Sequence, residues 1–408
     1  MSRQRLTGKR AVWLGLFGTP VLLIAAIMLV GVTAGSAGQS STAAPAATAQ
    51  TASGVITHTT ALGAGTQTLA DLQAYWTPER MAAAQPYPMP TGSASASETA
   101  SEPVSAPLNF VKMKADGTYE TGSAPAPAAT QTLTEPYHGD IPFSQWRYFA
   151  KYLPNTPGGG TNVAASAQHK MFFSQDGGSF VCSSSTIGID GVWTAGHCVS
   201  DGAGTFSTNV FFCPSYDNGV NPAAGCWGAE ALTVSNVWHA SGDVDYDIGG
   251  ADAADSGTVN AGLIGSFTGV LGFAYVGVAE GTNEAININY VSFGYPQGAP
   301  FNGNKIEICA SSLGYVDPGT AGGQDSKAIG CDMTGGSSGG PWLISMGLPG
   351  QPGGGTPQFP VCCNFVFGHN DWRHTTPNEP NEMNSPPFNC LALFAFHAIN
   401  DTAPPACP

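Results

Sequence analysis

The sequence predicts an all-β protein. Short segments rich in Val, Ile, Phe and Tyr are separated by Gly, Pro and Asn, the pattern of strands joined by turns. Sustained helical periodicity is scarce, and only residues 229–238 fit a helix as well as a strand. The expected strands are 170–173, 179–189, 210–213, 231–237, 286–293, 305–309, 342–344, 361–367 and 391–396.

The N-terminus has the features of an export signal. An apolar stretch over residues 11–32 follows Arg3, Arg5, Lys9 and Arg10, and small residues come after it. This order predicts a signal peptide over residues 1–37. The apolar stretch is also long enough to span a bilayer, so an uncleaved signal anchor is the alternative.

The next part of the chain is rich in Ala, Thr, Ser, Pro and Gly and lacks apolar periodicity. We interpret residues 38–135 as a low-complexity spacer or propeptide, in which 69–76 and 108–119 are candidates for local structure. A lead-in segment over 136–164 follows. Residues 165–408 are long enough to bury one substantial core and form the expected folded domain.

Ser338 is enclosed by glycines in the loop before residues 342–344. Glycine lets the backbone approach closely, and two neighbouring amides can then converge on a developing oxyanion. An ordinary turn would contain the same residues. A catalytic role for this loop therefore depends on whether a base and a carboxylate lie elsewhere in the chain. His197 ends an apolar run and precedes Cys198. A lone histidine of this kind is usually inert, but a fixed one can serve as a general base.

Asp243, Asp245 and Asp247 alternate along the chain, so they would share one face if the segment is a strand. They also fit the first three ligand positions of a calcium loop. The glycine that such a loop requires is replaced by Ile248, and the final glutamate by Ala254. A helix–loop–helix calcium site is therefore not expected, and a non-standard one remains an alternative.

His197, Asp247 and Ser338, in this order, are surrounded by the motifs Thr-Ala-Gly-His-Cys and Gly-Ser-Ser-Gly-Gly-Pro. They resemble the trypsin-like (chymotrypsin-fold) serine proteases, and more closely the secreted bacterial branch that includes the glutamyl endopeptidases. The resemblance covers residues 165–408. It implies a double antiparallel β-barrel, with the site in the cleft between two six-stranded barrels.

The resemblance also implies residue roles. Ser338 would be the nucleophile, His197 the general base and acid, and Asp247 the carboxylate that orients the imidazole. Asp245 remains an alternative to Asp247. The amides of Gly336 and Ser338 would form the oxyanion hole.

Two positions depart from the pattern of trypsin. Ser337 stands where trypsin has an aspartate that pairs with the new N-terminal amine after zymogen cleavage, so activation by that ion pair is not expected. Gly196 replaces the alanine that commonly precedes the histidine, a change from which we expect no consequence.

Substrate preference depends on Asp332, which stands where the carboxylate of trypsin selects Lys or Arg at P1. We therefore expect a preference for Lys or Arg, unless Asp332 only caps its turn. The alternative is a glutamyl-specific enzyme, whose relatives use hydroxyls and a histidine. Thr334 and His369 are the candidates for those roles.

All ten cysteines lie between residues 182 and 407, and an even count in an exported chain predicts disulfides. Cys182–Cys198 resembles a bridge of the family. Cys213–Cys226 and Cys309–Cys331 are expected from proximity in sequence. The sequence does not pair the remaining cysteines, Cys362, Cys363, Cys390 and Cys407. The CxxC and HxxxH spacings of zinc sites are absent, so we expect no metal and no cofactor.

The composition fits a protein that acts on peptides outside the cell. Lys and Arg total 13 against 28 acidic residues, a net charge of −15, which disfavours nucleic acid and anionic lipid as partners. We expect a monomeric, secreted serine endopeptidase, anchored at the outer face of the membrane only if the signal segment stays uncleaved. A catalytically inactive homologue that acts as a secreted binding module is the alternative.

Overall fold

The computed structural model describes most of the region expected to fold, together with parts of the segment that precedes it. The described residues are 51–52, 54–92, 106–114, 117–125, 143–147, 163–279, 288–317, 324–346, 363–374 and 381–407. The predicted signal segment (1–37), most of the predicted lead-in segment (136–164) and Cys362 lie outside these residues.

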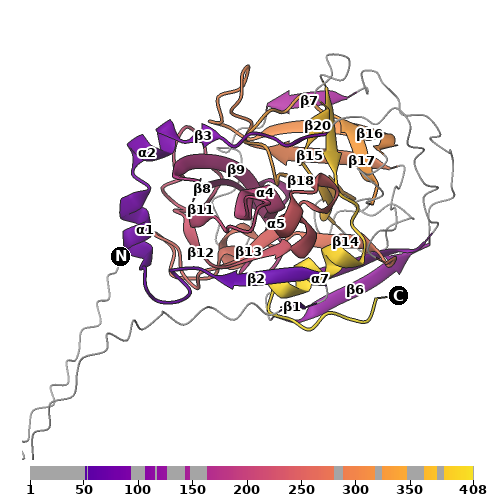
Figure 1. Ribbon diagram of the computed structural model, residues 1–408, viewed down its shortest axis with the longest axis horizontal. Helices are drawn as coiled ribbons and strands as arrows, with labels where there is room; N and C mark the ends of the chain where they lie inside the picture. The colour runs from indigo at the N-terminus through magenta and orange to yellow at the C-terminus, as the bar shows by residue number, and fades with distance from the viewer. Residues whose placement is uncertain are drawn as a thin grey trace, which may run out of the picture. The chain divides into compact units, whose positions relative to one another are not determined.

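Six antiparallel strands close into a barrel (Figure 1). Their order is β11-β8-β9-β10-β13-β12, and the ring closes because β12 pairs with both β11 and β13. The six strands are β8 (Gln168–Gln175), β9 (Gly178–Thr186), β10 (Gly191–Ala195), β11 (Thr208–Pro214), β12 (Trp227–Ser235) and β13 (Ile248–Ala253). Large apolar side chains such as Phe173, Phe212 and Trp227 are fully buried in this barrel.

A second sheet contains ten strands. Its main path runs β21-β17-β16-β15-β18-β19-β14-β5-β6, and β7 pairs with β16. The strands are β5 (Leu108–Met113), β6 (Tyr119–Ala124), β7 (Ser144–Arg147), β14 (Gly272–Val276), β15 (Asn289–Gly294), β16 (Glu307–Asp317), β17 (Ser326–Gly330), β18 (Pro341–Ile344), β19 (Phe365–His369) and β21 (Glu382–Ser385). Phe293, Trp342 and Phe365 fill its core. The all-β class and the double-barrel architecture are confirmed.

The helices are short, apart from one at the C-terminus. They are α3 (Val163–Ser166), α4 (Gly196–Val199), α5 (Asn236–Ser241), the 3-10 turn η2 (Val244–Tyr246), α6 (Ile264–Thr268) and α7 (Cys390–Ile399). The ambiguous segment 229–238 divides between β12 and α5, where the Ser235 side chain caps the new helix. None of the helices among the described residues has the length and hydropathy to cross a bilayer.

The strand predicted at 391–396 is wrong, because these residues lie in α7. Asn389 starts the helix by accepting a hydrogen bond from the Leu391 amide at 3.0 Å. Almost every residue of α7 is buried, so its apolar residues surround the helix instead of forming a stripe. A short helix that is apolar on all sides has the same sequence pattern as a buried strand.

Part of the predicted spacer packs against the first barrel. It contributes β1 (Thr51–Ala52), β2 (Val55–Thr59), α1 (Leu69–Tyr75), α2 (Pro78–Ala83), β3 (Gln85–Pro86) and β4 (Thr91–Gly92). β2 extends the sheet beside β12, and α1 is held by a capping box at Thr68 (Figure 1). Leu72 and Trp76 are buried, so this part of the segment does not form a free-standing spacer.

Four disulfides lie in the described part of the chain. The three expected pairs, Cys182–Cys198, Cys213–Cys226 and Cys309–Cys331, are all present. The fourth, Cys390–Cys407, ties the end of the chain to the start of α7. Cys363 is also disulfide-bonded. Because such bonds persist in oxidising compartments, they fit a protein that acts outside the cytosol.

Removal of Cys182–Cys198 tests whether this bridge does more than stabilise the fold. It encloses a sequence separation of 16 residues and Cys213–Cys226 one of 13, so replacing either pair with serine should cost about 3 kcal/mol of unfolding free energy. Denaturant titration under oxidising conditions measures both losses. Only the first bridge adjoins His197, so only its removal should also lower turnover. Equal turnover in the two variants would contradict a positioning role for this bridge.

Candidate active site

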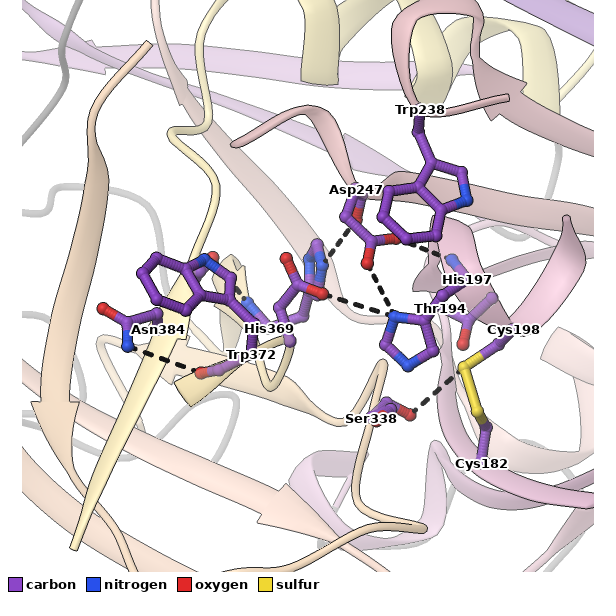
Figure 2. A network of polar contacts seen from close by, with 12 residues as sticks. Cys182, Thr194, His197, Cys198, Trp238, Asp247, Ser338, His369, Trp372 and Asn384 are labelled. Carbon is purple, nitrogen blue, oxygen red and sulfur yellow. Dashed lines mark hydrogen bonds and ion pairs between the residues drawn. A yellow bond between two sulfur atoms is a disulfide. The ribbon is translucent and has the colours of Figure 1, made fainter. Parts of the chain in front are cut away.

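His197 follows β10 at the start of α4, next to the disulfide of Cys198. The main-chain amide of His197 donates to Asp247 Oδ1 at 2.6 Å, and its Nδ1 donates to Asp247 Oδ2 at 2.6 Å (Figure 2). Both side chains are buried. Nδ1 carries the proton that is donated to Asp247. In this tautomer of the imidazole, Nε2 has a free lone pair. This is the tautomer that a general base requires.

Gly196 has a structural role that the sequence did not suggest. A Cβ atom at this position would lie 2.7 Å from Asp247 Oδ1 and 3.0 Å from the Trp238 ring. Glycine therefore allows the carboxylate to reach the His197 amide. The expectation that Gly196 has no consequence is wrong for this reason.

The segment 243–247 forms the 3-10 turn η2, so the expected strand with three aspartates on one face is also wrong. Asp243 caps the turn by accepting from the Asp245 amide at 3.1 Å. Asp245 Oδ1 accepts from Ser326 Oγ at 2.8 Å, in the second sheet. Of these three aspartates, Asp247 is the one that accepts hydrogen bonds from His197. Because the turn sends successive side chains in different directions, the two candidate carboxylates have different partners.

The charge of Asp247 is held by its hydrogen bonds. Burial alone would raise the pKa of this carboxyl, but His197 and the bonds that it donates lower the pKa below its ordinary value. His369 supports the segment from behind, since its Nε2 donates to the Asp247 carbonyl at 3.0 Å. Trp193 Nε1 donates to the other ring nitrogen of His369 at 3.2 Å. Burial lowers the pKa of His369 to about 4, so the ring is neutral.

Ser338 lies in the loop that leads into β18, and the first barrel fixes this loop. The Ser183 amide donates to the Ser338 carbonyl at 2.7 Å, and Ser183 Oγ donates to the Gly336 carbonyl at 2.9 Å. Gly336 has φ +97°, which only glycine adopts readily. In the described part of the chain, the amides of Gly336 and Ser338 donate to no protein acceptor. Two free amides in one tight turn can stabilise an oxyanion.

Ser338 and His197 are brought to the same place from the two sheets (Figure 2). The Ser338 carbonyl lies 3.8 Å from Cys198 Sγ, the neighbour of His197. His197 Nε2 and Ser338 Oγ are both buried, and neither has a hydrogen-bond partner among the residues that the structure describes. Bonds between catalytic groups are often long without substrate and shorten in the reacting complex.

Sequence reasoning missed Asp371, a third buried group beside the imidazole. Asp371 Oδ1 lies 3.4 Å from His197 Nδ1. One ligand atom from each of His197, Asp247 and Asp371 falls within 4.8 Å of the others, so the three could also hold a metal ion. The available signal was a carboxylate just beyond the strand that ends at His369.

The residues expected to select substrate are not all brought together. Asp332 and Thr334 lie in the nucleophile loop, where Thr334 Oγ1 donates to the Gly298 carbonyl at 2.6 Å. His369 lies behind Asp247, with both ring nitrogens bonded. Arg373, which the sequence did not single out, donates to the Met333 carbonyl and interacts electrostatically with Asp332. Glu382 interacts with the Arg373 guanidinium more strongly than Asp332 does.

Tyr87, in the predicted spacer, covers the imidazole. Its ring stacks on His197 with centroids 5.5 Å apart and planes at 18°. Its amide donates to the Val181 carbonyl at 3.1 Å, and a Cβ atom on Gly335 would lie 2.9 Å from the Tyr87 carbonyl. As a result, His197 is 1% exposed and Ser338 is 0% exposed.

A second serine–histidine pair lies inside the first barrel but lacks the other parts of a catalytic site. His169 Nδ1 is 3.4 Å from Ser184 Oγ, and its Nε2 is 2.8 Å from Thr186 Oγ1. Burial lowers the pKa of His169 to about 3, and no acidic group contributes to this shift. A base that cannot hold a proton near neutral pH is not suited to general base catalysis.

Comparison with known proteins finds neither a matching family model nor a matching curated protein. Among solved structures, the thermostable serine protease AL20 from an extremophilic microorganism is 31% identical. The match covers 59% of this chain and 100% of AL20, with a TM-score of 0.46.

Two further solved structures resemble the chain. The protease Anisep from Arthrobacter nicotinovorans is 29% identical, with 59% of this chain and 99% of Anisep covered and a TM-score of 0.47. A Glu endopeptidase is 15% identical, with 62% and 96% covered and a TM-score of 0.41. The 31% identity over the entire length of AL20 is the match that defines the family. The chain belongs to the trypsin-like serine proteases, and it is a serine endopeptidase.

Proposed function

We propose that the chain cleaves peptide bonds through an acyl-enzyme formed on Ser338, with His197 as base and Asp247 as its orienting carboxylate. One observation carries this proposal. His197 donates from Nδ1 to Asp247 at 2.6 Å, while its Nε2 and Ser338 Oγ are buried and have no partner in the described part of the chain. Buried polar groups without partners are costly and rare, so two of them at one site are best explained by a catalytic role.

In the proposed reaction, Ser338 Oγ attacks the scissile carbonyl carbon while His197 Nε2 takes the hydroxyl proton. The carbonyl oxygen becomes an oxyanion, to which the amides of Gly336 and Ser338 donate. When the C–N bond breaks, His197 gives its proton to the leaving amine. Water then attacks the ester, again with His197 as base. Asp247 stabilises the imidazolium in both steps and keeps its own charge.

We further propose that the enzyme is secreted and acts on protein or peptide substrates as a monomer. Residues 1–37 would be the signal peptide, 38–135 the spacer or propeptide, 136–164 a lead-in segment and 165–408 the protease domain. The four disulfides and the acidic composition support this organisation. Cationic peptides would approach such a surface more readily than anionic ones.

The N-terminal segment supports a role as a propeptide, because residues 84–92 cross the proposed site. β3 pairs with β9, Tyr87 stacks on His197, and β4 pairs with β20 (Arg373–His374). Gln297 Nε2 donates to the Ala84 carbonyl at 2.6 Å, which holds the start of the crossing. A substrate cannot reach Ser338 while this segment is in place, so we propose that the precursor is latent.

Replacement of each candidate carboxylate with asparagine tests the triad. We predict that Asp247→Asn lowers kcat by about 10⁴-fold, because an amide cannot hold the required imidazole tautomer. Asp245→Asn is the matched control, and it should change kcat by less than about tenfold because Asp245 bonds to Ser326 instead. Turnover of a peptide substrate measures both variants. A larger loss in Asp245→Asn would contradict the assignment.

Latency is tested by releasing the covering segment. We expect Tyr87→Ala to raise the peptidase activity of the precursor, because the stacking contact with His197 is lost. Tyr119→Ala is the control, since Tyr119 belongs to the same predicted spacer but packs against Phe396. N-terminal sequencing of the most active species should place the cleavage after residue 92. Full activity of an intact, uncleaved precursor would disprove latency.

The choice of P1 residue depends on Arg373. A Lys or Arg side chain that approaches Asp332 would compete with the guanidinium that already interacts with it. An acidic P1 side chain would be attracted to that guanidinium, in competition with Glu382 and Asp332. Arg373 therefore favours the glutamyl alternative over the Lys/Arg preference first expected from Asp332.

Paired reporter peptides with Glu or Arg at P1 distinguish these possibilities. We predict a higher kcat/KM for the Glu peptide, and a loss of about 10- to 100-fold for that peptide in Arg373→Met, which keeps an unbranched stem but removes the charged guanidinium. Arg373→Lys should retain part of the preference. Preference for the Arg peptide, abolished by Asp332→Asn, would instead establish Asp332 as the selecting residue.

A further inference from the structure

Asp371 is a fully buried carboxyl group that the reaction proposed above does not use. It is 0% exposed, and its amide donates to the Asn384 carbonyl at 3.1 Å, which fixes it beside β21. Its Oδ1 lies 3.4 Å from His197 Nδ1, the atom that donates to Asp247. Two carboxyl groups therefore converge on one imidazole nitrogen.

The two carboxyl groups differ in their hydrogen bonds. Asp247 accepts from the amide and from Nδ1 of His197, each at 2.6 Å. Neither oxygen of Asp371 accepts a hydrogen bond from the described residues. A buried carboxylate without donors is strongly unfavourable, and a second negative charge beside Asp247 adds repulsion. A neutral acid has neither cost, and its O–H can use Asp247 as an acceptor.

We propose that Asp371 is a positioning residue of the catalytic site, a neutral carboxylic acid whose O–H donates to the carboxylate of Asp247. This proposal rests on the function proposed for His197 and Ser338. No proton is transferred from Asp371 during turnover. Its hydrogen bond supplies Asp247 with a third donor, besides the two from His197.

The surrounding charges agree with this protonation state. Burial raises the pKa of Asp371 well above its ordinary value, and the negative charges of Asp247 and Asp245 raise it further. On the far side of Asp247, His369 is neutral. Lys327, which lies 3.9 Å from the centre of the Phe367 ring, lowers the pKa of His369 further. The imidazolium that forms during turnover therefore meets one full negative charge, that of Asp247.

A hydrogen bond from Asp371 is also consistent with the tight packing around Asp247. Gly196 is needed because Asp247 lies against the main chain at residue 196. A third hydrogen bond, donated by Asp371, would restrict rotation of the Asp247 carboxylate in that position. Asp247 then keeps both oxygens directed at His197, which is the geometry that orientation of a general base requires.

Infrared spectroscopy tests the protonation state independently of catalysis. In the full-length Ser338→Ala chain at neutral pH, we expect a protonated carboxyl C=O band that disappears in Asp371→Asn. Asp252, whose pKa burial raises to about 8, should give a second such band, which is identified by Asp252→Asn. If no protonated band is lost in Asp371→Asn, Asp371 is ionised and the proposal is overturned.

Kinetics test the positioning role after removal of the N-terminal segment. Asp371→Ala removes the donor and should lower kcat about tenfold, with KM little changed because Asp371 does not touch substrate. Asp371→Asn supplies a neutral N–H donor and should recover most of that loss. Equal kcat in Asp371→Ala and the wild type would refute positioning. If the wild type itself had no peptidase activity, the function proposed for Ser338 would fail, while the infrared result would still decide the protonation of Asp371.

Discussion

The proposed catalytic geometry depends on one buried negative charge, that of Asp247. It is stabilised by two donors from His197 and by the proposed O–H of Asp371, and no solvent reaches it. Each supporting feature of the site follows from this charge. Gly196 makes room for the carboxylate, η2 directs it toward the imidazole, and His369 bonds to the Asp247 carbonyl. Because burial of an unpaired charge is so unfavourable, the site cannot easily adopt another arrangement.

The same constraint connects the two sheets. His197 and Asp247 come from the first barrel, whereas Ser338 and Asp371 come from the second. Hydrogen bonds from Ser183, in the first barrel, to the loop that carries Ser338 connect the two sheets at the site. The segment that carries Tyr87 then closes over the junction from outside. In the proposed latent precursor, the protease is folded and disulfide-bonded while this segment covers His197.

Sequence reasoning recovered the parts of this arrangement that are encoded locally. The all-β class, three disulfide pairs and the loops around His197 and Ser338 could be predicted, because short motifs and turn residues specify them. The helix α7 was missed because an apolar segment buried on all sides has no stripe to reveal its period. The packing of residues 54–92 was missed because α1, α2 and β2 gain stability from the barrel and not from their own composition.

Long-range contacts account for the remaining differences. The position of Asp371 just beyond the strand that ends at His369 does not specify that it lies beside His197, and nothing near Arg373 in the sequence indicates its interaction with Asp332. Tyr87 is separated from His197 by more than a hundred residues, yet the two rings stack. Such contacts depend on the closure of the fold, which local patterns cannot specify.

The most direct test of the account is covalent labelling of the nucleophile. After removal of the N-terminal segment, the protein is treated with a fluorophosphonate probe and the modified residue is identified by peptide mass spectrometry. The account predicts a single label on Ser338 that disappears in Ser338→Ala and is strongly slowed in Asp247→Asn. The absence of labelling at Ser338, or labelling of Ser184 beside His169, would contradict it.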